Sequence, residues 1–253
     1  MLSRPRPTLP VAVAVLVAGL AWVGHSLAAP ATVDGPATAS APAARLNPPK
    51  SIFETRVIGQ SVLGRDIVAS RMGEPGGRPV LVVGVIHGDE NKGALITKAL
   101  RDRPVPSGIE LWIIDSMNPD GQAAGTRQNA NRVDLNRNFS RGWGYIPDDG
   151  TSNQYSGEAP ADQPETQALQ DFITAVQPAI TIVYHQDATN VGSGGARKDI
   201  SAAYSRLVGL PIGVTPCTKG CTGTFGAYAN WRVAGGTSFI VELPPSSKVT
   251  PAM

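Results

Sequence analysis

Histidine is scarce in this chain of 253 residues. Of three copies, His25 lies in an apolar N-terminal segment, while His87 and His185 each follow an apolar run typical of a buried strand. Glu90 comes three residues after His87, so both side chains can converge on one point if the strand turns into a helix there. Two histidines and one glutamate form a standard ligand set of catalytic zinc, which keeps a further position open for water. The sequence therefore predicts a metal site of His87, Glu90 and His185.

A carboxylate closes the last apolar run of the chain, at Glu242. Burying a carboxylate is unfavourable unless it has a partner or a chemical task, so Glu242 is a second candidate for catalysis. By itself, however, a histidine at a strand end is more often a hydrogen-bonded structural residue, and H-x-x-E occurs often by chance. Other motifs must decide whether these residues form a catalytic metal site or are structural.

Further motifs accompany these residues in a distinctive order along the chain. They are His87-Gly88-Asp89-Glu90, Asn118-Pro119-Asp120-Gly121, Asp134-Leu135-Asn136-Arg137-Asn138-Phe139, Tyr184-His185-Gln186 and Val241-Glu242-Leu243-Pro244. Alone, N-P-D-G is a turn signal. Together, over residues 53–245, the motifs resemble the zinc carboxypeptidase family, the carboxypeptidase A-like enzymes, and most of all its small bacterial branch, which includes murein peptide amidases.

The resemblance implies a role for each residue around the metal. His87, Glu90 and His185 match the ligands of one zinc ion per chain. Glu242 matches the carboxylate that activates water and later protonates the leaving amine, which is general acid–base catalysis. Asp134 matches the acid that orients a zinc-bound histidine and fixes its tautomer.

The resemblance also implies how a substrate would be held. Asn136 and Arg137 match the pair that binds the terminal carboxylate of the substrate, for which the planar guanidinium supplies two parallel donors. Arg127 matches the arginine that polarises the scissile carbonyl, although Ala123 and Ala124 stand where the family often has another basic residue just upstream.

The elements that must position these residues alternate between strand-like and helix-like runs, which is typical of an α/β fold. The expected strands are residues 80–86, 109–114, 179–184 and 237–243, with an antiparallel edge pair at 56–58 and 67–71. The expected helices are residues 91–101, 163–176 and 200–208. We expect a three-layer α/β/α domain with a mixed, mainly parallel twisted sheet and the zinc at the carboxyl edge of the strands.

Two local features refine this expectation. Asp162 is predicted to be the N-cap of the helix at 163–176, with Glu165 three residues later as in a capping box. Residues 138–160 are rich in Gly, Pro and Asp and are predicted to form a long loop at the rim of the site. Eleven residues follow Glu242, fewer than the family usually has, so we expect one face of the sheet to be less covered.

The N-terminal residues 1–28 are predicted to be a signal peptide. Arg4 and Arg6 precede a continuous apolar run of 13 residues, 11–23. An uncleaved anchor is the alternative, but a helix of that length spans only about 20 Å of a hydrocarbon core about 30 Å thick. We therefore expect export to the periplasm, the cell wall or the medium, with no stable membrane span after signal removal.

The remaining chain divides into an Ala/Pro-rich linker at residues 29–50 and a catalytic domain at 51–253. In an exported protein, Cys217 and Cys221 are expected to form a local disulfide, with free thiols as the alternative. The net charge of +2 is spread without a Lys/Arg-rich stripe, which argues against nucleic-acid binding. We expect a monomer.

The predicted activity is zinc-dependent hydrolysis of an amide bond next to a free terminal carboxylate, by a carboxypeptidase or a murein peptide amidase. The substrate would be a peptide, and peptidoglycan stem peptides are one candidate class given the predicted export. Two alternatives stay open. One is an N-acyl amino acid deacylase of the desuccinylase or aspartoacylase type, and the other is a catalytically inactive binding module.

Overall fold

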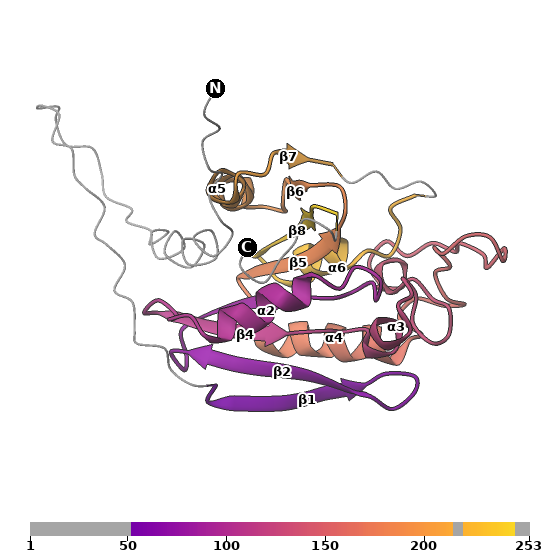
Figure 1. Ribbon diagram of the computed structural model, residues 1–253, viewed down its shortest axis with the longest axis horizontal. Helices are drawn as coiled ribbons and strands as arrows, with labels where there is room; N and C mark the ends of the chain where they lie inside the picture. The colour runs from indigo at the N-terminus through magenta and orange to yellow at the C-terminus, as the bar shows by residue number, and fades with distance from the viewer. Residues whose placement is uncertain (1–51, 215–219, 246–253) are drawn as a thin grey trace, which may run out of the picture.

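The computed structural model describes residues 52–214 and 220–245. The predicted signal peptide, the linker and Cys217 lie outside these residues. Within them the chain builds one eight-stranded sheet (Figure 1). The strands are β1 (Glu54–Gln60), β2 (Asp66–Gly73), β3 (Arg78–Val83), β4 (Ile109–Ile114), β5 (Ile180–Gln186), β6 (Asn190–Gly192), β7 (Ile212–Gly213) and β8 (Thr237–Leu243).

The order of strands across the sheet is β1-β2-β4-β3-β5-β8-β6-β7. The central strands β4, β3, β5 and β8 run parallel to one another. The hairpin of β1 and β2 joins β4 antiparallel at one side, and β6 joins β8 antiparallel at the other. The predicted mixed sheet with a parallel centre is therefore confirmed, and the carboxyl ends of its central strands meet at one edge.

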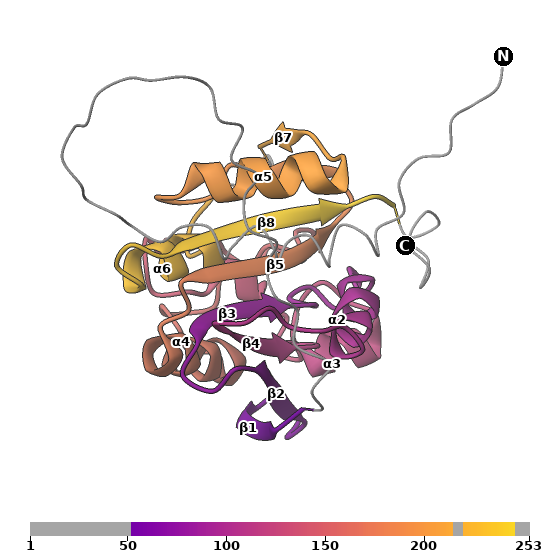
Figure 2. The same cartoon turned by 90° about the vertical axis from the view of Figure 1, so that its left-hand side faces the viewer.

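Helices cover both faces of the sheet (Figures 1 and 2). They are α2 (Gly93–Arg101), α3 (Pro119–Ala124), α4 (Pro164–Val176), α5 (Lys198–Val208) and α6 (Phe225–Arg232), with a short 3-10 helix η2 (Leu135–Arg137). Alternate side chains of a strand point to opposite faces. In β3, Val80 and Val82 belong to the core cluster that includes residues of α2 and α5, whereas Leu81 and Val83 belong to the cluster that includes residues of α4 and α6. The result is the predicted three-layer α/β/α architecture.

The start of α4 differs from the prediction. Gln163 is its N-cap residue, and no side chain caps the helix there. The carboxylate of Asp162 instead accepts hydrogen bonds from the backbone amides of Glu158 (2.8 Å) and Ala159 (3.1 Å), which closes the preceding loop. Glu165 is buried and accepts from the backbone amide of Val62 (3.1 Å) in the β1–β2 turn. Both carboxylates bind other segments and are not available to cap the helix.

The long loop at residues 138–160 is confirmed as a segment without helix or strand. Across residues 52–214 and 220–245, no helix is both long and apolar enough to cross a membrane.

Candidate active site

His87 lies in a turn beyond the end of its strand. β3 ends at Val83, and the turn is closed by a hydrogen bond from the Glu90 amide to the His87 carbonyl (3.1 Å). The expected strand at 80–86 and helix at 91–101 are both present with shifted ends, and α2 begins only at Gly93, so β3 does not turn directly into a helix at His87. A turn nevertheless brings the side chains of His87 and Glu90 together, as the predicted helix would have done.

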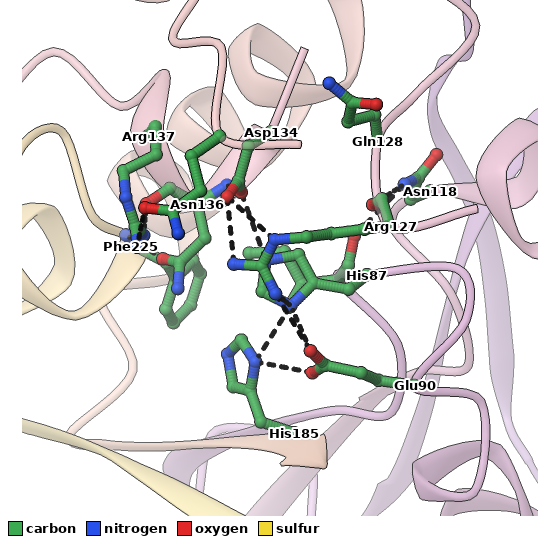
Figure 3. Close-up of polar contacts among 12 residues, drawn as sticks. His87, Glu90, Asn118, Arg127, Gln128, Asp134, Asn136, Arg137, His185 and Phe225 are labelled. Atoms are coloured by element: carbon green, nitrogen blue, oxygen red, sulfur yellow. Dashed lines mark hydrogen bonds and ion pairs between the residues drawn. The ribbon is translucent and has the colours of Figure 1, made fainter. Parts of the chain in front are cut away.

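The two histidines and Glu90 converge on one point (Figure 3). His185 lies inside β5, one residue before its end. One oxygen of Glu90 lies 2.9 Å from His87 Nδ1, and the other lies 2.9 Å from His185 Nδ1. The two Nδ1 atoms are 3.2 Å apart, and one ligand atom from each of the three residues lies within 4.8 Å of the others. This is the cluster that the sequence predicted.

The arrangement of donors and acceptors fits a cation. His87 Nε2 lies 3.1 Å from the Asp134 carboxylate, so its proton is held on that nitrogen and the lone pair of Nδ1 faces Glu90. A lone pair of nitrogen and a carboxylate oxygen at 2.9 Å repel each other unless a proton or a metal ion lies between them. A His₂Glu set with nitrogen and oxygen donors is a standard zinc site, so the residues fit zinc.

The charges of the cluster stabilise its ionised forms. Burial alone would raise the pKa of Glu90, but His87 and His185 outweigh this effect and hold the pKa far below its usual value. Burial alone would lower the pKa of His87, but the carboxylates of Asp134 and Glu90 raise it. The site is therefore built to keep Glu90 and Asp134 as carboxylates.

Arg127 lies directly against the predicted ligands. Its Nε and Nη2 donate to one oxygen of Asp134 (3.0 and 2.9 Å), and its Nη1 donates to Glu90 (3.0 Å) and lies 3.1 Å from His87 Nδ1. Burial lowers the pKa of Arg127, but Asp134 and Glu90 more than offset this, so the guanidinium stays charged. Asp134 thus holds both a predicted metal ligand and the predicted carbonyl-polarising arginine.

Glu242 lies on β8, next to the cluster. It is opposite His185 in the parallel pairing of β5 and β8, and the two residues share one face of the sheet. The Glu242 side chain is buried, and one of its oxygens accepts a hydrogen bond from the Ala188 amide (3.4 Å). Strand register alone therefore brings the predicted general base to the predicted metal site.

Asn136 and Arg137 belong to η2, whose first turn is capped by the Asp134 side chain. Asn136 uses its side-chain oxygen to accept from the Phe225 amide (2.9 Å). The Arg137 guanidinium donates to the Asn136 carbonyl (2.9 Å) and to Gln154 (3.3 Å), but its buried Nε has no partner. Among the described residues no carboxylate forms an ion pair with Arg137, which leaves this cation available to an anionic ligand.

One cavity of about 390 Å³ collects these groups. It is lined by all of the predicted site residues except Asp134, which lies behind His87, and by the additional residues Asn153, Gln154, Gln186, Asp187, Ala188, Cys221, Thr224 and Ile240. Sequence reasoning missed Gln154, which bonds Arg137 from the long loop, because nothing in a loop sequence indicates which side chain turns inward. Cys221 is disulfide-bonded; the predicted pairing with Cys217 involves a residue outside the described ranges.

Comparison with known proteins agrees with this geometry. The family model "Zinc carboxypeptidase" matches residues 45–192. The chain belongs to the zinc carboxypeptidase family and is a hydrolase of that family with an intact His-Glu-His metal site. Sequence relatives include murein peptide amidase A of Vibrio campbellii, 32% identical over 204 residues that cover 75% of this chain and 79% of the relative.

A second sequence relative is murein peptide amidase A of Escherichia coli K12, 27% identical over 184 residues that cover 69% of this chain and 75% of the relative. The crystal structure of the murein-tripeptide amidase of E. coli O157 matches with a TM-score of 0.65 and 25% identity, covering 80% of this chain and 90% of that one. Carboxypeptidase A of Helicoverpa armigera matches in fold, with a TM-score of 0.61 and 19% identity over 77% and 60% of the two chains.

Proposed function

We propose that this chain binds one zinc ion through His87, Glu90 and His185 and hydrolyses the amide bond next to the free terminal carboxylate of a peptide. The observation that carries the proposal is that three groups line the same cavity. They are the His₂Glu cluster, the buried carboxylate of Glu242 and the guanidinium of Arg137, whose Nε is unpaired.

Bound at this site, zinc would polarise the scissile carbonyl and lower the pKa of an attacking water. The role of general base is assigned to Glu242, and its burial beside His185 and its place in the lining of the same cavity support this assignment. Glu242 accepts the proton of the attacking water and returns it to the nitrogen of the leaving amine. The reaction needs no second acid, because one carboxylate performs both transfers in turn.

Arg127 is placed to stabilise the negative charge that develops on the carbonyl oxygen. Its guanidinium lines the cavity next to the ligand atoms and is held in place by Asp134. A preorganised donor of this kind contributes about 3 kcal/mol to transition-state stabilisation. Asp134 acts through Arg127 and His87 and has no contact with the cavity itself.

Arg137 and Asn136 would bind the terminal carboxylate. A buried guanidinium with an unpaired nitrogen favours an anion, and burial lowers the pKa of Arg137, with Asp134 opposing and Arg127 adding to the shift. A substrate carboxylate would restore the missing partner in a charge-assisted hydrogen bond. The site therefore favours cleavage at a chain end that carries a free carboxylate.

Peptidoglycan stem peptides are the substrate class that we propose. Two relatives that cover at least two thirds of this chain carry the name murein peptide amidase A. The proposed location is outside the cytoplasm, on the basis of the apolar run at residues 11–23, and cell-wall peptides with free carboxylates occur there.

The proposal is tested by mass spectrometry of products. Zinc-loaded protein is incubated separately with ordinary peptides, with γ-D-glutamyl-diaminopimelate stem peptides and with N-acyl amino acids, beside a Glu242→Gln control. Loss of one terminal unit from the stem peptides, absent in the control, is the expected result. Cleavage of ordinary peptides alone would support the proposed reaction but contradict peptidoglycan stem peptides as the substrate class. Cleavage of N-acyl amino acids alone would contradict the peptidase function.

A further inference from the structure

The N-P-D-G motif has no part in the chemistry proposed above, yet its asparagine is fully buried beside the site. Asn118 is the N-cap residue of α3, and its side-chain oxygen accepts from the Gly121 amide (2.9 Å). Capping a helix needs only an oxygen, which Ser, Thr or Asp would supply equally well. Capping of α3 therefore gives no role to the side-chain amide nitrogen of Asn118.

That nitrogen joins two segments of the active site. Asn118 Nδ2 donates to the carbonyl of Ile86 (3.2 Å), the residue before His87, and to the carbonyl of Arg127 (3.3 Å). Figure 3 shows Asn118 beside the Arg127 backbone, with the Arg127 side chain extending toward His87 and Glu90. The side chains of Arg127 and His87 contact each other through Nη1 and Nδ1. The Asn118 amide group bonds to the backbone of Arg127 and to the backbone of Ile86, the residue before His87.

The surrounding packing leaves these segments little freedom. A Cβ on Gly88 would lie 1.9 Å from the carbonyl carbon of Gly121, and a Cβ on Gly121 would lie 2.4 Å from the carbonyl oxygen of Gln128. The turn that carries His87, the start of α3 and the segment of Arg127 therefore meet backbone against backbone. The two hydrogen bonds donated by Asn118 join the segments across this contact.

We propose that Asn118 is a positioning residue that fixes the Arg127 guanidinium relative to His87. This inference rests on the role of Arg127 in the proposed function. A displacement of about 1 Å can reduce catalysis about 100-fold even when no reacting group is lost. Loss of the Asn118 donors should therefore act on the chemical step through Arg127, with substrate binding through Arg137 unaffected.

Two substitutions isolate the donor. Asn118→Asp keeps an oxygen for the Gly121 amide and removes both donated hydrogen bonds. Asn118→Ser keeps a capping oxygen without adding a charge and replaces the amide NH₂ by a single hydroxyl on a side chain one bond shorter. Asn230→Asp is the matched control. Asn230 also accepts from one backbone amide, that of Ser238 (2.7 Å), and donates to a backbone carbonyl, that of Ser238 (3.1 Å), but it lies on α6 outside the cavity.

We expect Asn118→Asp and Asn118→Ser each to lower kcat about 10- to 100-fold with KM changed less than about threefold, and Asn230→Asp to leave both within about threefold. In an Arg127→Met background, Asn118→Ser should lower kcat by less than about threefold more. An equal further loss in that background, or an equal loss for Asn230→Asp, would overturn the proposal.

A crystal structure of Asn118→Ser provides a readout that does not depend on activity. The expected result is a displaced Arg127 guanidinium with the three predicted metal ligands in place. An Arg127 that keeps its contacts with His87 and Glu90 would overturn the positioning role. This outcome is distinguishable from failure of the proposed function, in which the unmodified protein would cleave no peptide whatever the position of Arg127.

Discussion

His185 and Glu242 are direct neighbours across the parallel strands β5 and β8. Residues in register on adjacent strands point to the same face, about 4.8 Å apart. The predicted metal ligand and the predicted general base are thus held by the hydrogen bonds between two central strands of the sheet.

Replacing Glu242 by Gln should separate metal binding from chemistry. The amide keeps the shape of the side chain but cannot accept a proton from water, so kcat should fall by at least about 100-fold. Metal content and Tm should stay close to those of the unmodified protein, since Glu242 is not one of the three clustered ligands. Metal analysis and calorimetry, run beside the rate assay, check this. Loss of the metal from the variant would mean that Glu242 is itself a metal ligand.

Removing the charge of Arg127 should have opposite effects on rate and on metal affinity. Its Nη1 lies within 3.1 Å of atoms of both His87 and Glu90, where a positive charge disfavours a bound cation. We expect Arg127→Met to bind zinc about tenfold more tightly, while kcat falls about 100-fold from loss of the oxyanion donor.

Competition with a chelating zinc indicator measures the affinity of the Arg127→Met variant. Arg132→Met, which removes an exposed arginine of the same loop, is its control. Weaker zinc binding by Arg127→Met would show that the arginine supports the ligands through Asp134 more than it repels the cation.

Substrates with an amidated end test the role assigned to Arg137. The unmodified protein should cleave a peptide with a free terminal carboxylate at least about tenfold faster than its amide, because a charge-assisted hydrogen bond contributes about 1.5–3 kcal/mol. In Arg137→Gln this preference should largely disappear. The ratio of the two kcat/KM values is the measurement, and an unchanged ratio in the variant would place the carboxylate elsewhere.

Asp120 should make the fold sensitive to acid. Burial by itself would raise the pKa of Asp120, but hydrogen bonds from the Leu63 amide (2.9 Å) and from Arg65 (2.5 Å) lower it below its usual value. A carboxyl group whose pKa is lower in the folded state stabilises the fold at neutral pH, and this contribution is lost as the pH falls below about 4.

Asp120→Asn should therefore reduce the free energy of unfolding at pH 7 by about 1–3 kcal/mol and have a smaller effect at pH 3. Urea unfolding at the two pH values checks the difference. An equal loss at both would mean that the carboxylate charge contributes nothing to the hairpin contact.

Much of the fold was predictable because the signals are local. The bounds of β4 and β8 are those predicted, because β-branched and aromatic residues concentrate in both segments. The end of α5 at Gly209 was also predictable, because a glycine adopts the left-handed conformation at a helix end without strain. The ligand cluster followed from residue type together with family motifs.

The remaining features depend on contacts between distant segments. Asp162 was predicted to cap α4, but its carboxylate accepts hydrogen bonds from backbone amides of the preceding loop instead. His185 and Glu242 lie side by side because of the strand register, which a single sequence does not reveal. Asn118 looks like a turn residue in the sequence, and its bonds to Ile86 and Arg127 become visible only in three dimensions.

The most direct test of the account is a zinc titration of the metal-free protein, with bound metal and hydrolysis of a terminal amide recorded in the same samples. We predict that activity rises in proportion to bound zinc and stops rising at about one equivalent. The Glu242→Gln variant should bind the same amount of zinc without activity, and His185→Ala should show neither tight binding nor activity. Hydrolysis by the metal-free protein, or full zinc occupancy without hydrolysis of any peptide, would contradict the proposed function.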